Sequence, residues 1–275
     1  MSASQVINDK LNTVSKADIS DLARELGISP KGSHGEVANR LLDQSPAAID
    51  AFIKRRYRRK VKERQAELIS DAELLGELAK VERIDWGVVQ GQLDAKIQSE
   101  YVRKFVRYDD LVAGVRRSLH GAVTGYAIAS WYNHWTTVLI EDHISQHRNV
   151  VPTLKSVKGV DVFLGDHPFD LKITYLPRSW DVEAAITDPM GIARWLYENQ
   201  GAQRFGDDNR FYVVLINQAD VTQSWKLKRE MSIIAPQVDA FLDSVAVSSA
   251  DVLSFIYNNR SYTAKCKTLV VLGDV

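Results

Sequence analysis

The sequence predicts an α/β fold in which helices flank a mixed central sheet, with a small helical domain at the N-terminus. Residues 210–217 (RFYVVLIN) and 267–272 (KTLVVL) are continuous apolar runs, which are typical of strands buried on both faces. Residues 160–174 form the pattern of two short strands joined by a tight turn. Helix-forming segments precede and separate these strands, and this order favours an α/β layer around a mixed sheet.

Length and composition are those of an ordinary globular protein. The 275 residues are 45% hydrophobic and 25% charged, which allows one large domain with a small appendage. Cys266 is the only cysteine, so an internal disulfide is excluded and a reducing compartment is indicated. No apolar run in the sequence approaches the ~20 residues of a membrane helix, and the N-terminus lacks a signal-peptide pattern. We therefore expect a cytoplasmic location.

Two capping signatures mark helices within residues 1–45. Ser15 and Ser33 are each followed by an acidic residue three positions later, and the first helix is expected to end at Gly27. The resulting helix-loop-helix resembles a SAP domain, a small DNA-binding module. The matching residues are Leu11, Leu22, Leu26, Gly27, Gly32, Arg40 and Leu41. The resemblance implies a DNA-binding domain over residues 1–45, and a plain helical hairpin used for docking or dimerisation is the alternative.

A basic helix is expected within residues 46–99, a helical linker. Residues 54–64 (KRRYRRKVKER) carry eight basic residues and one acid, so the rest of the chain must sum to −7 for the net charge to be zero. A run of this kind gives salt-sensitive affinity for DNA phosphates, while a solvated helix face is the simpler interpretation. The candidate DNA-binding residues are Lys54, Arg55, Arg56, Arg58, Arg59 and Lys60.

Further helices are expected on both sides of the predicted hairpin. Residues 101–147 are predicted to form long helices that break or bend near residues 121–125, where glycines occur. Residues 225–242 are predicted to form a helix that breaks at Pro236.

The predicted hairpin at residues 160–174 contains three charges that an apolar core would not accept unpaired. Asp170 and Lys172 are two residues apart on one strand, so their side chains share a face. Asp161 lies on the neighbouring strand, within reach of both. Burying such charges costs several kcal/mol unless they are paired or bind an ion. The alternative to a functional site is an Asp–Lys salt bridge on a half-exposed sheet face.

This pattern resembles the PD-(D/E)xK nuclease superfamily, which has the restriction-endonuclease-like fold. The signature of that superfamily is an acid on one strand, then an acid, any residue and a lysine on the next, usually preceded by a glutamate on a helix. Asp161, Asp170 and Lys172 match the strand residues, and Glu141 matches the glutamate. Val160 stands where the superfamily name implies proline. The resemblance implies a nuclease domain over residues 100–275.

Alternative assignments stay open. Asp166 can replace Asp161 as the first acid, although it falls in the turn, where aspartate is common for conformational reasons. Asp142 can replace Glu141, which shares a helical face with apolar neighbours. Residues 94–96 (DAK) also fit acid-x-lysine, but they lie in a polar helical stretch where a solvated face is expected.

The resemblance also implies a cofactor and a role for each residue. Mg²⁺ prefers hard oxygen ligands and keeps several waters. Asp161, Asp170 and the backbone carbonyl of Leu171 would hold it, with Glu141 bound directly or through water. The metal would activate a water and neutralise charge on a phosphate. Lys172 would orient the water and stabilise the developing negative charge, because the two acids favour its charged form.

Together these expectations describe a Mg²⁺-dependent DNA endonuclease, with a type II site-specific restriction enzyme as the preferred interpretation. Its partner would be double-stranded DNA, and a homodimer would suit cleavage of both strands. A cognate DNA methyltransferase would accompany a restriction enzyme. The alternatives are a repair or defence nuclease without a fixed site, a non-catalytic DNA-binding protein, and a protein-interaction scaffold.

Overall fold

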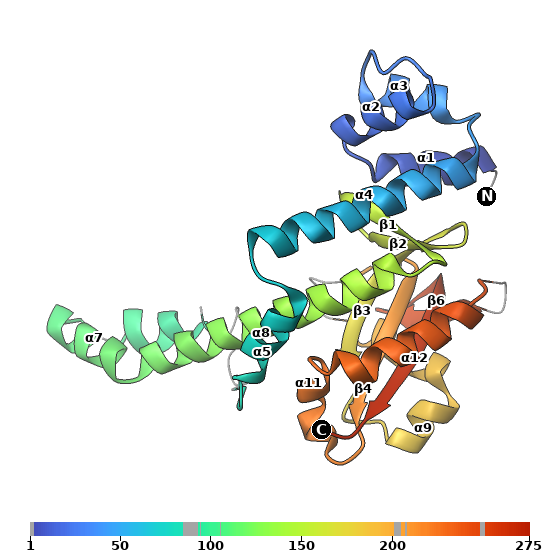
Figure 1. The fold of residues 1–275 in the computed structure, drawn as a ribbon. Helices are drawn as coiled ribbons and strands as arrows, with labels where there is room; N and C mark the ends of the chain where they lie inside the picture. The colour runs from blue at the N-terminus through green and yellow to red at the C-terminus, as the bar shows by residue number, and fades with distance from the viewer. Residues whose placement is uncertain are drawn as a thin grey trace. The chain divides into compact units, whose positions relative to one another are not determined.

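The structure is a computed structural model that describes residues 3–84, 93, 95–104, 106–200, 205–206, 208–247 and 251–275. The chain divides into two compact units, which we call the sheet unit (Met1–Leu68 with Ile140–Val275) and the helical unit (Ile69–Leu139). Figure 1 shows the path of the chain through its helices and strands. These units divide the chain at other positions than the predicted boundaries near residues 45 and 99, and the three-domain division stays a prediction.

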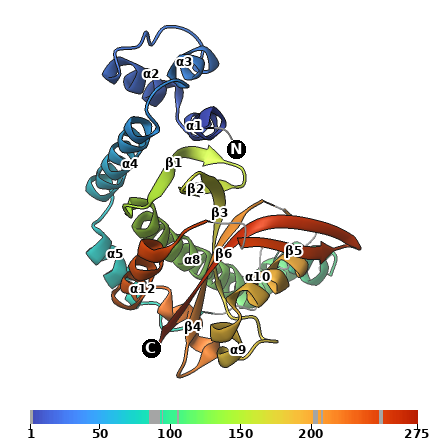
Figure 2. The ribbon, with the colours of Figure 1, turned by 90° about the vertical axis from the view of Figure 1, so that its right-hand side faces the viewer.

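Six strands form one mixed sheet in the order β1-β2-β3-β4-β6-β5 (Figure 2). β3, β4 and β6 are parallel neighbours, whereas the pairs β1–β2, β2–β3 and β5–β6 are antiparallel. This mixed sheet confirms the predicted α/β class. The strands are β1 (Val150–Val157), β2 (Val160–Leu164), β3 (His167–Tyr175), β4 (Arg210–Asn217), β5 (Val252–Tyr257) and β6 (Arg260–Gly273).

The β2–β3 hairpin is confirmed where the sequence predicts it. Val162 pairs with Phe169 and Leu164 with His167, which leaves Gly165 and Asp166 as a two-residue turn. Gly165 has a φ of +58°, a left-handed conformation that glycine adopts without a Cβ penalty. This tight turn fixes which residues of β2 and β3 lie opposite each other.

Hydrophobic cores cover both faces of the sheet. One core contains Val213, residues 140 and 144 of α8 (His120–Gln146), and helices α11 (Ser224–Leu227) and α12 (Met231–Ser244). The other contains Val214 and helices α9 (Val182–Thr187) and α10 (Pro189–Glu198). Because adjacent side chains of a strand point to opposite faces, β4 is buried on both sides, as its continuous apolar sequence predicts. A short 3₁₀ turn, η4 (Val221–Gln223), precedes α11.

The C-terminal end of α8 is tied to α12. His143 Nε2 lies 2.9 Å from Asp239 Oδ1, and His147 Nε2 lies 3.0 Å from Asp243 Oδ1. The apolar side chain of Ile144 packs into the core between these contacts. The last turns of α8 are therefore fixed against the sheet unit, and this holds the helix position that carries Glu141.

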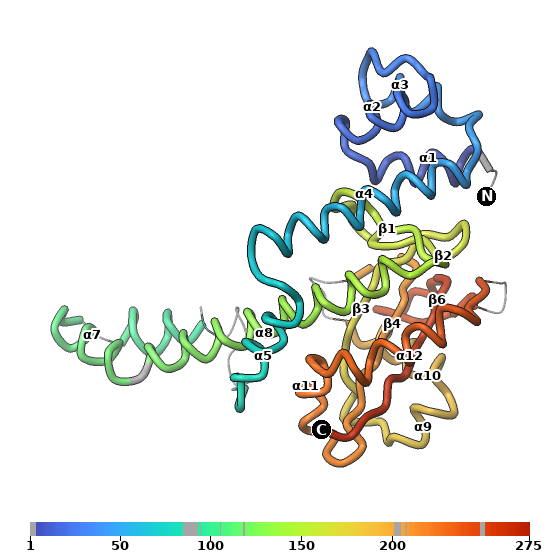
Figure 3. Tube along the Cα trace, viewed as in Figure 1, coloured from blue at the N-terminus to red at the C-terminus, as the bar shows by residue number. Residues whose placement is uncertain are grey.

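Four N-terminal helices precede the sheet, and Figure 3 follows their trace. They are α1 (Ala3–Asn12), α2 (Lys16–Glu25), α3 (His34–Leu41) and α4 (Pro46–Glu67). Ser15 and Ser33 cap α2 and α3 as expected. The helices share one core with Val151 and Phe163 of β1 and β2. Thr13 O also accepts hydrogen bonds from the β1 amides of Leu154 and Lys155 at 3.0 and 2.9 Å. The SAP resemblance of residues 1–45 stays a prediction.

The helical unit contains α5 (Asp71–Ala79), α7 (Tyr108–Gly114), the π-helices η1 (Ile97–Val102) and η2 (Val115–Leu119), and the first turns of α8. Asp94, of the alternative acid-x-lysine tripeptide, lies outside the described residues. In the part of the chain that the structure describes, no helix combines the length and the apolar character needed to cross a membrane.

A helix break near residues 121–125 and one at Pro236 are both wrong, and two strands, β1 and β5, arise where none was predicted. α8 runs unbroken through Gly121 and Gly125. α12 also continues through Pro236, because its buried side chains hold the helix on the sheet although proline supplies no amide donor. The helical segment is interrupted at residues 228–230 instead, between α11 and α12. β1 escaped prediction because Pro152 interrupts its apolar pattern, and proline is tolerated there since β1 lies at the sheet edge.

Candidate active site on the β2–β3 hairpin

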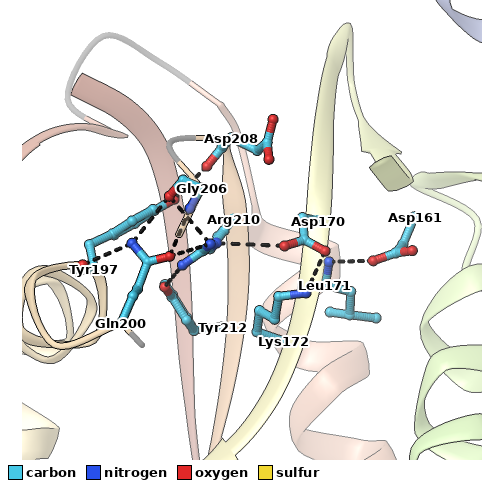
Figure 4. Close-up of polar contacts among 10 residues, drawn as sticks. All are labelled: Asp161, Asp170, Leu171, Lys172, Tyr197, Gln200, Gly206, Asp208, Arg210 and Tyr212. Atoms are coloured by element: carbon cyan, nitrogen blue, oxygen red, sulfur yellow. Dashed lines mark hydrogen bonds and ion pairs between the residues drawn. The ribbon is translucent and has the colours of Figure 1, made fainter. Parts of the chain in front are cut away.

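The β2–β3 register brings the three predicted strand charges together. Asp161 is next to the Val162–Phe169 pair, so its side chain lies beside Asp170 on the neighbouring strand. Asp161 Oδ2 accepts a hydrogen bond from the backbone N–H of Leu171 at 2.8 Å, as Figure 4 shows. This bond holds the Asp161 carboxylate against β3.

Lys172 adds a cation to this pair of acids. Its Nζ lies 2.6 Å from Asp170 Oδ1, and both side chains leave the same face of β3. The Lys172 side chain is 46% exposed, whereas the Asp170 side chain is only 13% exposed. The site therefore combines a largely buried carboxylate with an ammonium group that solvent or a ligand can reach.

The electrostatics of the site favour a bound cation. Burial raises the pKa of the Asp161 carboxyl, the N–H of Leu171 acts in the opposite direction, and the charge of Asp170 raises the pKa further. Burial also raises the pKa of Glu141 to about 7, and the charge of Asp161 acts in the same direction. These groups influence each other through like charge, and a positive ion placed among them would relieve that repulsion.

The contacts of Asp142 help to decide whether Glu141 or Asp142 is the helical acid of the site. Its carboxylate accepts a hydrogen bond from the Tyr57 hydroxyl at 2.7 Å and pairs with Arg64 at 2.9 Å. Asp142 therefore ties α8 to α4. Glu141, by contrast, is affected electrostatically by Asp161 and Lys172 of the hairpin. Of the two acids, Glu141 is the one associated with the candidate site.

Asp166, the alternative first acid, occupies the turn itself. It is exposed, and the two-residue turn separates it from the Asp161–Asp170 neighbours. Its position matches the conformational preference of aspartate for turns. The geometry therefore favours Asp161 over Asp166 as the carboxylate beside Asp170.

The donor set fits a magnesium ion held by few protein ligands. Among the described residues, no group of three or more His, Cys, Asp or Glu side chains is arranged to hold a metal ion. Mg²⁺ is commonly bound through one or two carboxylates, with water and substrate oxygens completing the shell. Asp161 and Asp170 can supply those carboxylates and the carbonyl of Leu171 a neutral oxygen. Glu141 would then act through water.

Sequence reasoning missed two buried cations near this site. Arg210 begins β4 and lies in register with Asp170 on the adjacent strand. Lys228 follows α11 and is 2% exposed; burial lowers its pKa to about 8, against the charge of Glu141. The sequence did contain a signal for Arg210: it is a charged residue at the start of an otherwise apolar strand, as Asp161, Asp170 and Lys172 are charged residues within the apolar hairpin.

The basic run on α4 has two kinds of members. Lys54, Arg56 and Lys60 are partly buried and face the rest of the sheet unit. Lys54 and Lys60 each donate to a backbone carbonyl at 2.6 Å. Arg56 pairs with the buried Asp18, and Lys60 lies 3.7 Å from the same carboxylate. These three side chains stabilise the packing of α4.

The other three members are exposed. Arg55 pairs with Glu25, and Arg59 pairs with Glu63 at 2.7 Å. Arg58 lies 3.5 Å from the carbonyl of Gln146. Exposed ion pairs of this kind contribute little to stability, typically about 0.2–1 kcal/mol. Arg55, Arg58 and Arg59 can therefore turn to a phosphate at small cost.

Comparison with protein-family models, curated proteins and solved structures finds no match to this chain. The geometry of the site is therefore the basis for assigning a function. The main feature of this geometry is the grouping of Asp161, Asp170 and Lys172 on two neighbouring strands. Glu141 of α8 interacts electrostatically with Asp161 and Lys172.

Proposed function

We propose that this protein is a Mg²⁺-dependent DNA endonuclease of the type II site-specific class. The observation that carries the proposal is the contact between Lys172 and Asp170 beside Asp161 on the β2–β3 hairpin. The order of these residues, with Glu141 on the preceding helix, resembles the PD-(D/E)xK signature. A salt bridge that only stabilised the sheet would not require a second, partly buried carboxylate with a raised pKa.

Each residue has a distinct role in this proposal. Asp161 and Asp170 hold Mg²⁺ together with the carbonyl of Leu171. When bound, the ion neutralises charge on the scissile phosphate and promotes attack by water. Lys172, whose ammonium is accessible, stabilises the negative charge that develops on the phosphate. Glu141 would act on the ion through water, and the charges of Asp161 and Lys172 both act on its carboxyl.

DNA would be held by surfaces away from the hairpin. Arg55, Arg58 and Arg59 are exposed members of the basic run and supply sequence-independent phosphate contacts. The SAP-like helices would add a second contact surface. A homodimer would present two hairpins to the two strands of a symmetric site, and a cognate methyltransferase would protect the host DNA.

The first test is cleavage of long duplex DNA by the purified protein in Mg²⁺, with Lys172→Ala and a chelator as parallel reactions. Discrete fragments that disappear in both reactions are expected, since the first removes the phosphate-stabilising charge and the second removes the metal. Lys158→Ala is a matched control, because Lys158 is an exposed lysine in the β1–β2 turn. This variant should cut as well as the unaltered protein.

Other outcomes separate the remaining functions. A smear with the same dependence on Mg²⁺ and Lys172 would keep the nuclease and replace the restriction role with repair or defence. DNA binding without cleavage by the unaltered protein would overturn the proposal in favour of a non-catalytic DNA-binding protein.

A further inference from the structure

The Asp170 carboxylate lies between two cations. Its Oδ1 is 2.6 Å from Lys172 Nζ, and its Oδ2 is 3.5 Å from Arg210 Nε. Asp170 and Arg210 are register partners on the parallel strands β3 and β4, so their side chains share a face of the sheet. Distance alone would make Lys172 the stronger partner. The surroundings of the two cations reverse that order.

Both terminal nitrogens of the Arg210 guanidinium are held by hydrogen bonds, as Figure 4 shows. One terminal nitrogen donates to the Tyr212 hydroxyl at 3.0 Å, and the other donates to Gln200 Oε1 at 2.7 Å and to Gly206 O at 3.3 Å. The guanidinium carbon lies 4.7 Å from the centre of the Tyr197 ring. These contacts leave the Arg210 side chain no alternative position that keeps the same partners.

The buried charge of Arg210 depends on Asp170. Its side chain is 8% exposed, and among the ion pairs of the described residues Asp170 is its one acidic partner. Arg210 Nε is buried and makes no hydrogen bond within the described part of the chain, although it lies within ion-pair distance of Asp170. A buried cation without a counter-charge is strongly destabilising. Removing the charge of Asp170 would therefore lower the stability of the fold mainly because the buried charge of Arg210 would lose its partner.

Lys172 is in the opposite situation. Its side chain is 46% exposed, so water screens its attraction to Asp170 and can replace it. The flexible four-carbon stem lets the ammonium move without disturbing β3. Lys172 can leave Asp170 at small cost, while Arg210 cannot.

We infer that Arg210 is a positioning residue that acts as the permanent counter-charge of Asp170, which leaves Lys172 available to the phosphate. This inference rests on the proposed function, and it explains how one lysine can pair with an acid in the free protein and still serve the substrate. Arg210 holds the Asp170 carboxylate in place from the protein interior. Lys172 is the exchangeable partner on the solvent side.

Double-mutant cycles on stability test this inference without any cleavage assay. Asp170→Asn is combined with Arg210→Met in one cycle and with Lys172→Met in the other, and urea unfolding is measured for all single and double variants. The coupling between Asp170 and Arg210 should change the folding equilibrium constant by more than about tenfold, as expected for a buried pair. The coupling between Asp170 and Lys172 should stay below about fivefold.

A third cycle, with Asp21→Asn and Arg24→Met, measures the coupling of an exposed ion pair on α2 and serves as the reference for a weak coupling. A coupling to Lys172 that equals or exceeds the coupling to Arg210 would overturn the inference. If Arg210→Met does not fold, the Lys172 cycle alone decides: the inference stands if the cost of Asp170→Asn differs by less than about fivefold with and without Lys172. A cost that falls more than about fivefold without Lys172 overturns it.

A cleavage arm separates this inference from the proposed function. Lys172→Met should lose cleavage while keeping its stability. Arg210→Lys, which keeps the charge but not the planar fork, should recover part of the cleavage lost in Arg210→Met, with the KM for DNA unchanged because Arg210 is buried. A purely packing role for Arg210 predicts equal loss in both variants. If the unaltered protein does not cut DNA, the proposed function fails and the unfolding cycles still measure the counter-charge.

Discussion

The β2–β3 hairpin and the basic run of α4 are both dense in charge, yet the structure uses their charges differently. In the hairpin, Asp170 pairs with Lys172 and Arg210, whereas its neighbour Asp161 has no ion pair among the described residues. On α4, Lys54, Arg56 and Lys60 are partly buried and bind a carboxylate or carbonyls of the sheet unit, whereas the contacts of the other candidate DNA-binding residues are exposed. Charge in the hairpin is held ready for a ligand, whereas much of the charge on α4 stabilises the fold.

The difference shows that the amount of charge in a segment says little about its purpose. What matters is whether each charged group finds an opposite partner within the fold. Arg56 finds the buried Asp18, so it serves stability. Asp161 finds another acid and a backbone amide, so it retains an unbalanced negative charge that suits a metal ion.

The strongest expected effect separates the two regions by activity. Asp161→Asn or Asp170→Asn should reduce cleavage by at least about 100-fold, because each removes a metal-binding carboxylate. Binding to DNA, measured with Ca²⁺ in place of Mg²⁺, should be unchanged. Asp166→Asn is the matched control from the same hairpin, and it should cut normally. Normal cleavage by Asp161→Asn would remove that residue from the site.

A second prediction concerns stability near α4. Asp18→Asn should destabilise the protein by about 2 kcal/mol at pH 7, because it leaves Arg56 without its buried partner. Burial acts to raise the pKa of Asp18, but Ser15, Arg56 and Lys60 together hold it below the ordinary value of 3.8. The stabilisation is therefore present above that value and is lost as the pH falls through the lower, folded-state pKa. Urea unfolding at pH 7 and pH 3 measures both effects; an equal difference at the two pH values would contradict the prediction.

A third prediction uses the raised pKa of Glu141. Because the folded-state pKa is about 7 and the ordinary value is 4.5, the folded protein loses stability as the pH rises from about 4.5 to about 7, where the unfolded chain binds fewer protons, and the loss is complete above about 7. Glu141→Gln should therefore stabilise the metal-free protein at pH 8 by up to about 2 kcal/mol, offset in part by the loss of a counter-charge for Lys228. The gain should vanish near pH 4.5. Unfolding measured at both pH values tests this, and the same gain at both would exclude the burial explanation.

The smallest expected effect concerns the exposed half of the basic run. Arg55→Ala, Arg58→Ala and Arg59→Ala, combined in one variant, should weaken DNA binding about threefold to tenfold. The dependence of log affinity on log salt should fall by up to about 3, since each phosphate contact contributes roughly 0.9. Fluorescence anisotropy across a salt series measures this change, and the unfolding midpoint should change only slightly, because each exposed ion pair contributes about 0.2–1 kcal/mol. Arg260→Ala, an exposed arginine at the start of β6, is the charge control. An unchanged salt dependence would show that α4 does not contact DNA.

Local features of the fold could be predicted from the sequence. The two-residue turn at Gly165, the capping serines of α2 and α3, and the burial of β4 all follow from short-range preferences and periodicity. The grouping of Asp161, Asp170 and Lys172 was also predictable, because a tight turn fixes the register of the strands that it joins.

Only the tertiary structure decided which oppositely charged side chains pair with those charges. Arg210 comes to Asp170 through the parallel pairing of β3 and β4, between which the chain forms α9 and α10, and nothing local in the sequence specifies that register. The pairing of Arg56 with Asp18 and of Arg64 with Asp142 likewise joins residues far apart in the chain. Turns, caps and apolar periods are set by neighbouring residues, whereas the balance of buried charge depends on which distant segments pack together.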